Sequence, residues 1–421
     1  IAVEILAINI RSNEFVKGYR VNTREVKISQ YADDSTIMLN DIDSISYVLD
    51  IVQEFGKVAG TKLNLEKTEG ILLGPLKDSV HEVNGIKFTN KAVKCLGIYI
   101  GHDKQDCYVK NWLNKITKME LLLKEWKNRN LTLFGKILIL KVLALSQLTY
   151  AFNILSVPLE VVKKVKQCLF DFIWNKKDRV KRDTVIGNIV KGGINMVDIE
   201  SKIAALRCAW VNRLIYLEGN WKMIFEEQLE TMGLDFNILL RSYFRSEKKL
   251  SGDIKINPFY IEIFKYFHTC KDSFCVNKMT DDSILSQVIW LNEHFISKGK
   301  CLYFKNWVKS GFIYIKDLFD ENGKWLRENC VISRLSNKHN WMCEYLLIKK
   351  IVGKVCLSVD TKRAKYINIK KTEAYFIHNN KFCFIKDKKS RYFYDILIEK
   401  KFKNPPVQYE WNEKFKSLNL E

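Results

Sequence analysis

The sequence predicts an α+β protein, and two observations carry this prediction. In the first hundred or so residues, short runs of alternating apolar and polar residues are separated by turn residues, which is typical of β-strands joined by tight turns. After about residue 104, apolar residues recur every three or four positions over long stretches, which predicts amphipathic helices. The chain has 421 residues, so we expect about two or three domains.

The first part of the chain should alternate helices and strands. Residues 1–10 are apolar nearly all round and predict the end of a buried helix. Residues 26–39 alternate on either side of Asp33-Asp34 and predict a tight β-hairpin. A helix capped by Asn40 or Asp41 should follow and end at Gly60. Further strands are expected at Lys62–Leu65, Gly70–Leu73 and Val93–Ile100, the last with Gly97 in its middle.

Long helices are expected after these strands. Their ranges are Trp112–Trp126, Leu131–Leu155, Val161–Trp174 and Ile199–Glu218. Pro158 should close the second of them, because proline cannot continue a helix. Beyond residue 220 the periodicity weakens, and the last part of the chain interleaves Lys with Tyr and Phe in a way that favours some strands.

The charge balance points to a polyanionic partner. Lys and Arg number 69 against 48 Asp and Glu, which gives a net charge of +21. Basic side chains that neutralise phosphates release condensed counterions, so nucleic acid is the partner that this excess favours. The alternative is a charged surface that serves solubility alone. A membrane partner is not expected, because the apolar stretch Leu131–Leu148 is short and is interrupted by Lys136 and Lys141.

The 11 cysteines are dispersed without a CxxC pair, which indicates a reduced, intracellular protein. We expect it in the nucleus and cytoplasm. His268, Cys270 and Cys275 lie close together and resemble half of a zinc site. Further ligands would have to come from Cys301, Cys330 or Cys343. We favour the alternative, in which these are buried or free thiols.

The sharpest local signal is QYADDS at residues 30–35. Asp33 and Asp34 stand at the tip of the expected hairpin, and the apolar residues Ile28 and Ile37 would hold its strands in place. Carboxylates are the ligands that Mg2+ prefers, and paired Mg2+ ions activate a 3′-hydroxyl and stabilise leaving pyrophosphate in nucleotidyl transfer. The alternative is that two adjacent acids merely form a polar turn, which is the better interpretation of an isolated pair.

The order of the segments around this pair resembles a known family. YADD, a helix, GTKLNLEKTEGILLG and VKCLGIYIG closely resemble the later palm motifs of reverse transcriptases. EWKNRNLTLFGKILILKVLALSQLTYAFNILSVP resembles the thumb of LINE-type (non-LTR) retrotransposon enzymes, as do FIWNKKDR and KGGINMVDI. NWVKSGFIYIKDLFDENGKW resembles a segment beyond that thumb. The resemblance is strong over residues 1–218, patchy over 219–330 and weak after that.

The resemblance implies a domain order and an activity. It places a partial palm at residues 1–103, a helical thumb at 104–220 and a basic, mainly helical C-terminal region at 221–421. The implied activity is that of part of an RNA-directed DNA polymerase, which extends a DNA primer on an RNA template with two Mg2+ ions. The implied partners are therefore an RNA template, a DNA primer, their RNA–DNA hybrid and deoxynucleotides.

Individual roles carry over on the matching motifs. By resemblance, Asp33 and Asp34 are the catalytic metal ligands, and Tyr31 positions the primer terminus. Lys67 would act as a catalytic charge partner and proton donor at the phosphates of the incoming nucleotide. Without its motif, Lys67 would be taken for a solvated surface lysine.

Other residues are expected to hold nucleic acid. Leu96 and Gly97 match the primer grip, where a glycine lets the backbone approach the primer closely. The thumb should follow the hybrid backbone without reading sequence. The basic residues expected to do so are Lys110, Lys115, Lys118, Lys124, Lys127, Arg129, Lys163, Lys164 and Lys166. The interleaved residues Trp112, Trp126 and Trp174 could stack on bases, but at helical spacing we favour a place in the core.

The sequence also departs from the family. Such polymerases need a third palm carboxylate upstream of the hairpin, whereas the acids before Asp33 are Glu4, Glu14 and Glu25, none of them in the required motif. The fingers and an N-terminal endonuclease are not matched either. We therefore expect this chain alone to be inactive as a polymerase.

Two hypotheses from different classes follow. In the first, the chain is part of a reverse transcriptase whose activity needs an upstream half. In the second, it is a non-catalytic remnant that binds nucleic acid without sequence preference. A third interpretation, an unrelated helical scaffold, explains the charge poorly and the motif order not at all. The intact YADD favours the first.

Overall fold

The structure is a computed structural model that describes residues 2–402, apart from residues 22, 78–80, 176, 190–191, 272–278, 336–339, 369–374, 380 and 387. The chain divides into two compact units. The first unit comprises Ile1–Ala151 and Pro158–Lys177, and the second comprises Phe152–Val157 and Asp178–Glu421. Helices and strands are mixed, which confirms the expected fold class at that level. The expected domain boundaries after residues 103 and 220 stay predictions.

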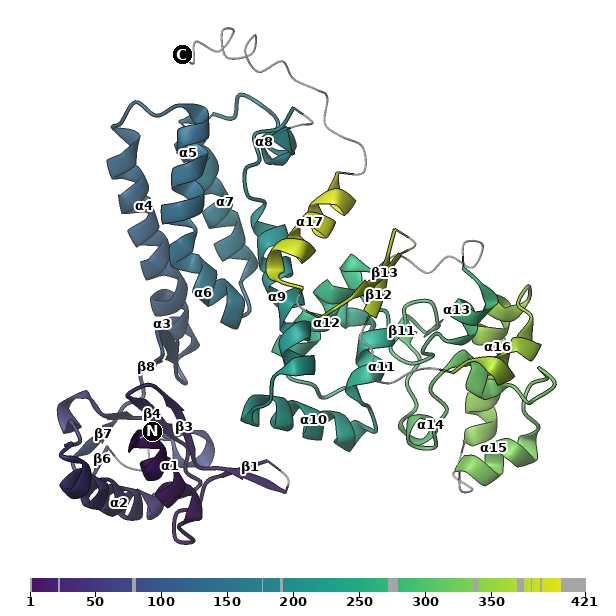
Figure 1. Ribbon diagram of the computed structural model, residues 1–421, viewed down its shortest axis with the longest axis horizontal. Helices are drawn as coiled ribbons and strands as arrows, with labels where there is room; N and C mark the ends of the chain where they lie inside the picture. Colours follow the sequence, from purple (N-terminus) through teal and green to yellow (C-terminus); the bar gives the residue numbers. More distant parts are fainter. Residues whose placement is uncertain are drawn as a thin grey trace. The chain divides into compact units, whose positions relative to one another are not determined.

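The first unit begins with a helix, continues with short strands and a second helix, and ends in helices (Figure 1). Its elements are α1 (Ala2–Ser12), β1 (Tyr19–Val21), β2 (Arg24–Val26), β3 (Ile28–Tyr31), β4 (Asp34–Ile37), α2 (Ser44–Ala59), η1 (Leu65–Lys67), β5 (Glu69–Gly70), η2 (Gly74–Leu76), β6 (Glu82–Val83), β7 (Ile86–Phe88), β8 (Val93–Cys95), β9 (Ile98–Ile100), α3 (Lys104–Tyr108), η3 (Val109–Leu113), α4 (Asn114–Lys127), α5 (Leu133–Ile139), η4 (Leu140–Ala144), α6 (Ser146–Ile154) and α7 (Leu159–Trp174).

The expected hairpin and the helix after it are confirmed. β3 and β4 pair antiparallel, and α1 and α2 pack against each other beside them. Their small core consists of Leu6, Ala7, Ile10, Val16, Ile28 and Val48. α2 starts after the Asp41 carboxylate, which accepts hydrogen bonds from the backbone N and Oγ of Ser44 at 2.9 and 2.6 Å. It ends at Gly60, whose φ of 67° is the left-handed conformation that favours glycine.

Of two expected strands, the one at Lys62–Leu65 is wrong and the one at Gly70–Leu73 is shorter than predicted. Residues 62–65 form no strand: the chain runs irregularly into the short helix η1. The side chain of Asn64 accepts a hydrogen bond from the backbone N of Lys67 at 3.2 Å, so it caps this turn and competes with strand pairing. The strand expected at Gly70–Leu73 is reduced to β5, which pairs in parallel with β7.

The helical part of the first unit is built from α4, α5, α6 and α7. The expected helix Leu131–Leu155 is divided into α5, the π-helical turn η4 and α6. Pro158 lies beyond its end and directly precedes α7. No single helix among the described residues is long and apolar enough to cross a membrane. The bent pair Leu133–Ala144 and Ser146–Ile154 passes that test by length and composition, with a bend of 50°.

The second unit is mainly helical. Its elements are α8 (Arg182–Ile186), α9 (Ile199–Tyr216), α10 (Asn220–Met232), α11 (Phe236–Arg241), η6 (Glu247–Lys249), α12 (Pro258–Cys270), α13 (Asp281–Leu285), β10 (Ile296–Ser297), β11 (Lys300–Cys301), α14 (Lys305–Lys309), η8 (Ile315–Leu318), α15 (Glu328–Leu335), α16 (Trp341–Cys356), η9 (Thr361–Tyr366), β12 (Tyr375–His378), β13 (Lys381–Phe384) and α17 (Ser390–Lys401). The hairpin β12–β13 agrees with strands expected late in the chain.

One large core holds the second unit together. α9 packs against both α12 and α17. Large side chains such as Phe264, Trp290 and Trp307 are fully buried in it. The indole Nε1 of Trp307 donates a hydrogen bond to the Glu344 carboxylate of α16 at 2.6 Å. The segment NWVKSGFIYIKDLFDENGKW, which begins at residue 306, therefore contributes to the core of this unit.

Candidate nucleotidyl-transfer and nucleic-acid site

The Asp33-Asp34 pair lies at a two-residue turn. Tyr31 pairs with Asp34 across the hairpin, so Ala32 and Asp33 form the turn itself. Ala32 has a φ of 53°, a conformation that normally favours glycine at the first position of a tight hairpin turn. The backbone is therefore strained at the residue that precedes both acids.

The strands below the turn are fixed to α1. Ile28 is buried against Leu6 and Ala7, and the Gln30 Nε2 donates to the backbone O of Val3 at 3.3 Å and to the Ser35 Oγ at the same distance. The tip itself is open: Asp33 and Asp34 are exposed, and Tyr31 keeps 70% of its surface. The arrangement presents two carboxylates to solvent from an anchored base.

These two carboxylates are a partial donor set for Mg2+. Among the described residues, no group of three or more His, Cys, Asp or Glu side chains gathers as a metal site. The upstream acids are engaged elsewhere: Glu4 pairs with Arg11 at 2.7 Å, and Glu25 accepts from the backbone N of Gly18 at 2.8 Å. Asp33 and Asp34 fit the expected cation in type, but a complete site needs further ligands.

A second hairpin lies beside the first. The segment expected as one strand, Val93–Ile100, is two: β8 and β9 pair antiparallel, and Leu96 and Gly97 form the turn between them. Both turn residues have positive φ, 47° and 81°, as a type I′ turn requires, so Gly97 is needed by the turn itself. The Cys95 Sγ lies 3.5 Å from the Thr36 Oγ1 of β4, which places this turn next to the hairpin with the acids.

The β8–β9 hairpin is held by buried and half-buried polar contacts that the sequence did not reveal. The buried Asn111 side chain accepts from the backbone N of Tyr99 at 2.9 Å and donates to its O at 2.7 Å. Asp106 accepts from the backbone N of Ala92 at 2.9 Å and from the Lys110 ammonium at 2.7 Å. These contacts attach the hairpin to the helical segment α3–η3.

The turn is also attached to α6. The Tyr150 hydroxyl donates to the backbone O of Leu96 at 2.8 Å. A side chain at Gly97 would stand 3.7 Å from the Tyr150 ring. The strained turn therefore links the strands of the first unit to two of its helical segments.

The expected basic contacts differ in their surroundings. Lys118, Lys124, Lys127, Lys163 and Lys164 are exposed on α4 and α7. The Arg129 guanidinium lies over the Trp126 ring at 4.3 Å. Lys110 is engaged with Asp106, as described above, and Lys166 is half-buried.

Lys115 belongs to a cluster of lysines. It is half-buried on α4, and burial together with the neighbouring Lys94 and Lys118 lowers its pKa. Lys94 of β8 was not expected from the sequence. It adds a cation close in sequence to the Leu96-Gly97 turn.

The remaining site residues stay separate. Lys67 ends η1 with an exposed side chain, and within the described part of the chain no recorded contact joins that side chain to Asp33 or Asp34. Trp112 and Trp174 are buried, which confirms the core interpretation for both, whereas Trp126 is half-buried.

The cysteine and histidine group does not form the suspected zinc site in the described residues. His268 is fully buried, its Nε2 lies 2.9 Å from the Leu239 O, and its Nδ1 accepts from the backbone N of Phe244 at 3.2 Å. Both ring nitrogens therefore already have backbone partners. Cys270 faces Cys208, with their sulfurs 3.7 Å apart, and Cys275 lies outside the described residues.

The buried His268 predicts acid sensitivity. Burial, and secondarily Lys271, hold its pKa well below the ordinary value of 6.5. Because the unfolded histidine binds a proton more readily, stability is present above pH 6.5 and is lost as pH falls below it, by up to about 1.4 kcal/mol per pH unit for one group. Urea unfolding of the second unit between pH 7.5 and 5.5 should show this slope. His268→Gln should remove most of it, and an unchanged slope would contradict the assignment.

The segment that contains both hairpins is similar to a known protein family. Residues 6–100, which contain both hairpins, match the family model of reverse transcriptase (RNA-dependent DNA polymerase). The resemblance of this segment to reverse transcriptases, and with it the resemblance to non-LTR retrotransposon enzymes, is confirmed.

A curated relative extends the similarity beyond that segment. The chain is 25% identical over 224 residues to the Transposon TX1 uncharacterized 149 kDa protein of Xenopus laevis. The alignment covers 51% of this chain but 17% of the relative. The chain therefore spans less than a fifth of the length of this relative, and we treat activity, substrates and partners as proposals below.

Proposed function

We propose that this chain is part of an RNA-directed DNA polymerase of a non-LTR retrotransposon, which extends a DNA primer on an RNA template. The observation that supports this best is the exposed Asp33-Asp34 turn next to the Leu96-Gly97 turn, inside the segment that matches reverse transcriptases. In this proposal residues 1–103 are a partial palm and residues 104–220 a thumb.

Each group then has a defined task. Asp33 and Asp34 hold Mg2+, which when bound would activate the primer 3′-hydroxyl and stabilise the leaving pyrophosphate. Tyr31 lies beside the primer terminus, and the strained Leu96-Gly97 turn supports the primer backbone. Lys67 neutralises phosphate charge of the incoming deoxynucleotide. Lysines of α4 and α7 bind the RNA–DNA hybrid through its phosphates.

A chain with two palm carboxylates should not polymerise by itself. We expect no extension of an oligo-dT primer on poly-rA with Mg2+ by the purified 421-residue chain, since two adjacent carboxylates cannot hold both ions. Extension above background by this chain would overturn the incomplete-site argument.

The polymerase assignment is tested on a longer protein that includes the region encoded upstream of this chain. The DNA upstream of the codon for Ile1 should be read, and any open frame expressed together with this chain. Extension that requires Asp33, measured with Asp33→Asn as the inactive control, supports the polymerase. Stop codons or unrelated sequence there would instead favour the second candidate, a non-catalytic remnant that binds nucleic acid without sequence preference, which the net charge of +21 supports.

A further inference from the structure

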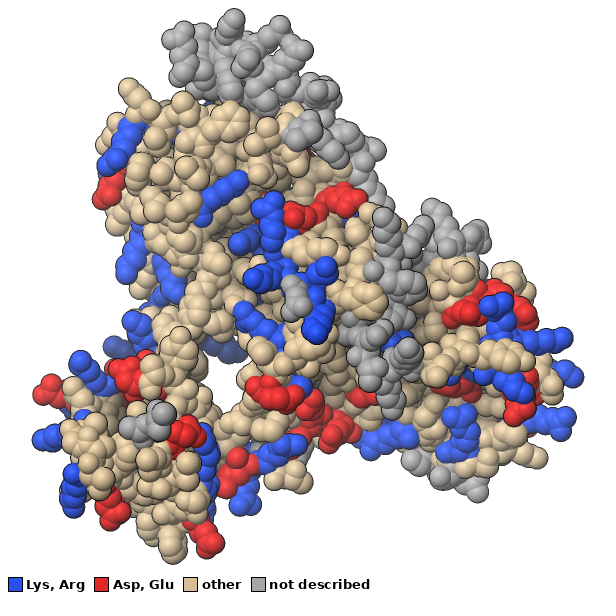
Figure 2. Space-filling view, viewed as in Figure 1, with Lys and Arg blue, Asp and Glu red and all other residues tan. Residues whose placement is uncertain are grey.

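The outer side of α9 and α17 in the second unit carries a group of cations. α17 buries Phe393 and Ile396 in the core of that unit. The group, which we call the α9–α17 face, consists of Lys202 and Arg213 on α9 and of Lys388, Lys389 and Arg391 around the start of α17. In Figure 2, Lys and Arg side chains gather over the region where Figure 1 shows α9 and α17.

Lys202 is a half-buried cation beside another cation. Burial, and then the nearby charge of Arg391, lower its pKa. Among the described residues, no carboxylate forms an ion pair or hydrogen bond with its ammonium group. Arg391 pairs with Asp395 at 3.0 Å, but both side chains are exposed and such pairs contribute little.

Arg213 has similar surroundings on the same helix. It is half-buried, burial lowers its pKa, and its guanidinium lies over the Trp210 ring at 4.6 Å. Within the described part of the chain, no acid is recorded as its partner. One face of the guanidinium is stacked and its N–H donors remain for an anion.

Two other buried or half-buried cations of this unit have acid partners. Arg207 pairs with Glu262 at 3.1 Å, and Lys401 pairs with the buried Asp198 at 2.9 Å. Desolvating a cation costs free energy unless an anion or hydrogen bonds offset it. Lys202 and Arg213 have no such acid among the described residues, so their N–H donors are open to an added anion.

The geometry points to a second nucleic-acid contact: we propose that the α9–α17 face binds the phosphodiester backbone of a single polynucleotide strand. Lys202 and Arg213 are eleven residues apart on one helix, roughly 16 Å at the rise of an α-helix. Phosphates of one strand repeat about every 3.4 Å along the axis of a duplex and more widely in an extended single strand, so that length spans a few successive phosphates. The contact lies in the second unit and involves no catalysis, so it does not depend on the polymerase proposal.

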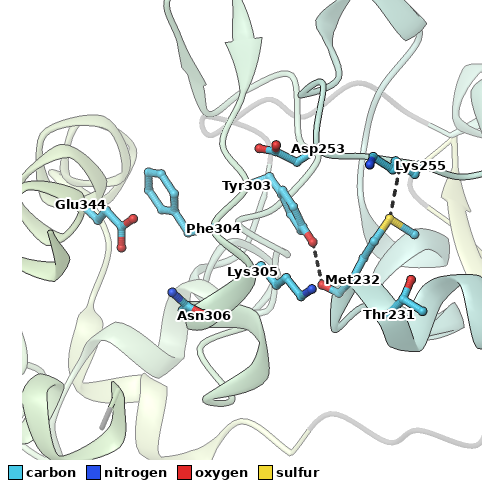
Figure 3. A pocket seen from close by; sticks show the side chains of 9 residues that line it. All are labelled: Thr231, Met232, Asp253, Lys255, Tyr303, Phe304, Lys305, Asn306 and Glu344. Atoms are coloured by element: carbon cyan, nitrogen blue, oxygen red, sulfur yellow. Dashed lines mark hydrogen bonds between the residues drawn. The ribbon is translucent and has the colours of Figure 1, made fainter. Parts of the chain in front are cut away.

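A hollow elsewhere in this unit is less suited to an anion. It has a volume of about 540 Å³ and is lined by Tyr303, Phe304 and their neighbours (Figure 3). Lys255 and Lys305 face it together with Asp253 and Glu344, so the charges cancel. The α9–α17 face has the larger excess of positive charge.

The test compares two triple variants of the full chain. The first removes three charges from the face, by Lys202→Gln, Arg213→Gln and Arg391→Gln. The matched control removes three exposed lysines elsewhere in the same unit, by Lys324→Gln, Lys350→Gln and Lys354→Gln. Binding of a single-stranded RNA and a DNA of the same sequence is measured by fluorescence anisotropy at several salt concentrations, with thermal unfolding to verify folding.

We expect the triple variant of the α9–α17 face to weaken binding of both the RNA and the DNA strand about tenfold at low salt. The slope of the logarithm of the binding constant against the logarithm of the salt concentration should fall by about 2, since each phosphate contact to a single strand contributes about 0.7. The control should change affinity less than twofold. Equal effects of the two variants would overturn the proposal. So would an unprotected Lys202 in an acetylation footprint with bound RNA, a readout that does not depend on a variant folding. Loss of RNA binding but not DNA binding would also overturn it, because a backbone site does not require the 2′-hydroxyl.

Discussion

Affinity of the full chain for an RNA–DNA hybrid should fall at least about a thousandfold between 50 and 200 mM salt. Proteins that neutralise six to ten phosphates lose roughly 10³ to 10⁵ in affinity over this interval, because bound cations replace condensed counterions. The expected contacts of the first unit provide such a number, and most of them are exposed on α4 and α7. Fluorescence anisotropy with a labelled hybrid measures the effect.

A triple variant tests whether the salt dependence of hybrid binding arises from the first unit. Lys124→Gln, Lys127→Gln and Arg129→Gln remove three charges around the exposed end of α4, and each should reduce the salt slope by about 1. Their loss should weaken unrelated hybrid sequences alike, since phosphate contacts carry no sequence information. An affinity that changes less than tenfold over the salt range would contradict electrostatic binding. A wild-type slope in this variant would place the contacts elsewhere.

The sequence predicted the elements whose signals are local. The acids at the tip of β3–β4, the glycine end of α2 and the helices after residue 104 all follow from short-range patterns. The prediction failed where local patterns were ambiguous. Val93–Ile100 alternates like one strand, yet Leu96 and Gly97 turn the chain back, and only the central glycine signalled this.

The contacts that position the candidate site were beyond reach of sequence reasoning. Asn111 bonds Tyr99 from 12 residues away, and Tyr150 bonds Leu96 from 54 residues away, so no local pattern encodes either. The described residues of the suspected half zinc site, His268 and Cys270, do not form one, as the favoured thiol interpretation expects, and Cys275 lies outside the described residues. His268 and Cys270 are close in sequence, but residues two apart on one helix do not face each other, and the helix α12 directs them to different partners.

Arg207→Met should destabilise the second unit by about 3–5 kcal/mol, the usual cost of removing one partner from a buried ion pair. Arg207 is fully buried, and its Nε donates to the Glu262 carboxylate at 3.1 Å. Its Nη1 donates to the backbone O of Phe152 at 2.9 Å and of Asn153 at 2.7 Å, and its Nη2 to the O of Leu155. One guanidinium thus satisfies the carbonyls that end α6, none of which a methionine can serve.

The loss has two parts that further variants separate. Glu262 would be left nearly buried without its cation, although the Ser156 hydroxyl still donates to it at 2.9 Å. Adding Glu262→Gln to Arg207→Met should therefore recover part of the stability, while loss of the guanidinium's hydrogen bonds to the backbone carbonyls keeps the remainder lost. Urea unfolding monitored by hydrogen exchange of the α9 amides measures the stability of this unit separately from that of the first unit.

Arg363→Met is the matched control, since it also removes an arginine paired with an acid. Its partner Asp282 lies at 2.7 Å, but both side chains are more than half exposed, so the expected cost is below about 1 kcal/mol. Comparable losses in the two variants would show that burial of Arg207 is not what matters. A large loss confined to Arg207→Met would mean that the carbonyls at the end of α6 depend on this one buried cation from α9. The stability of the second unit would then depend on residues 152–157, which precede most of that unit in the sequence.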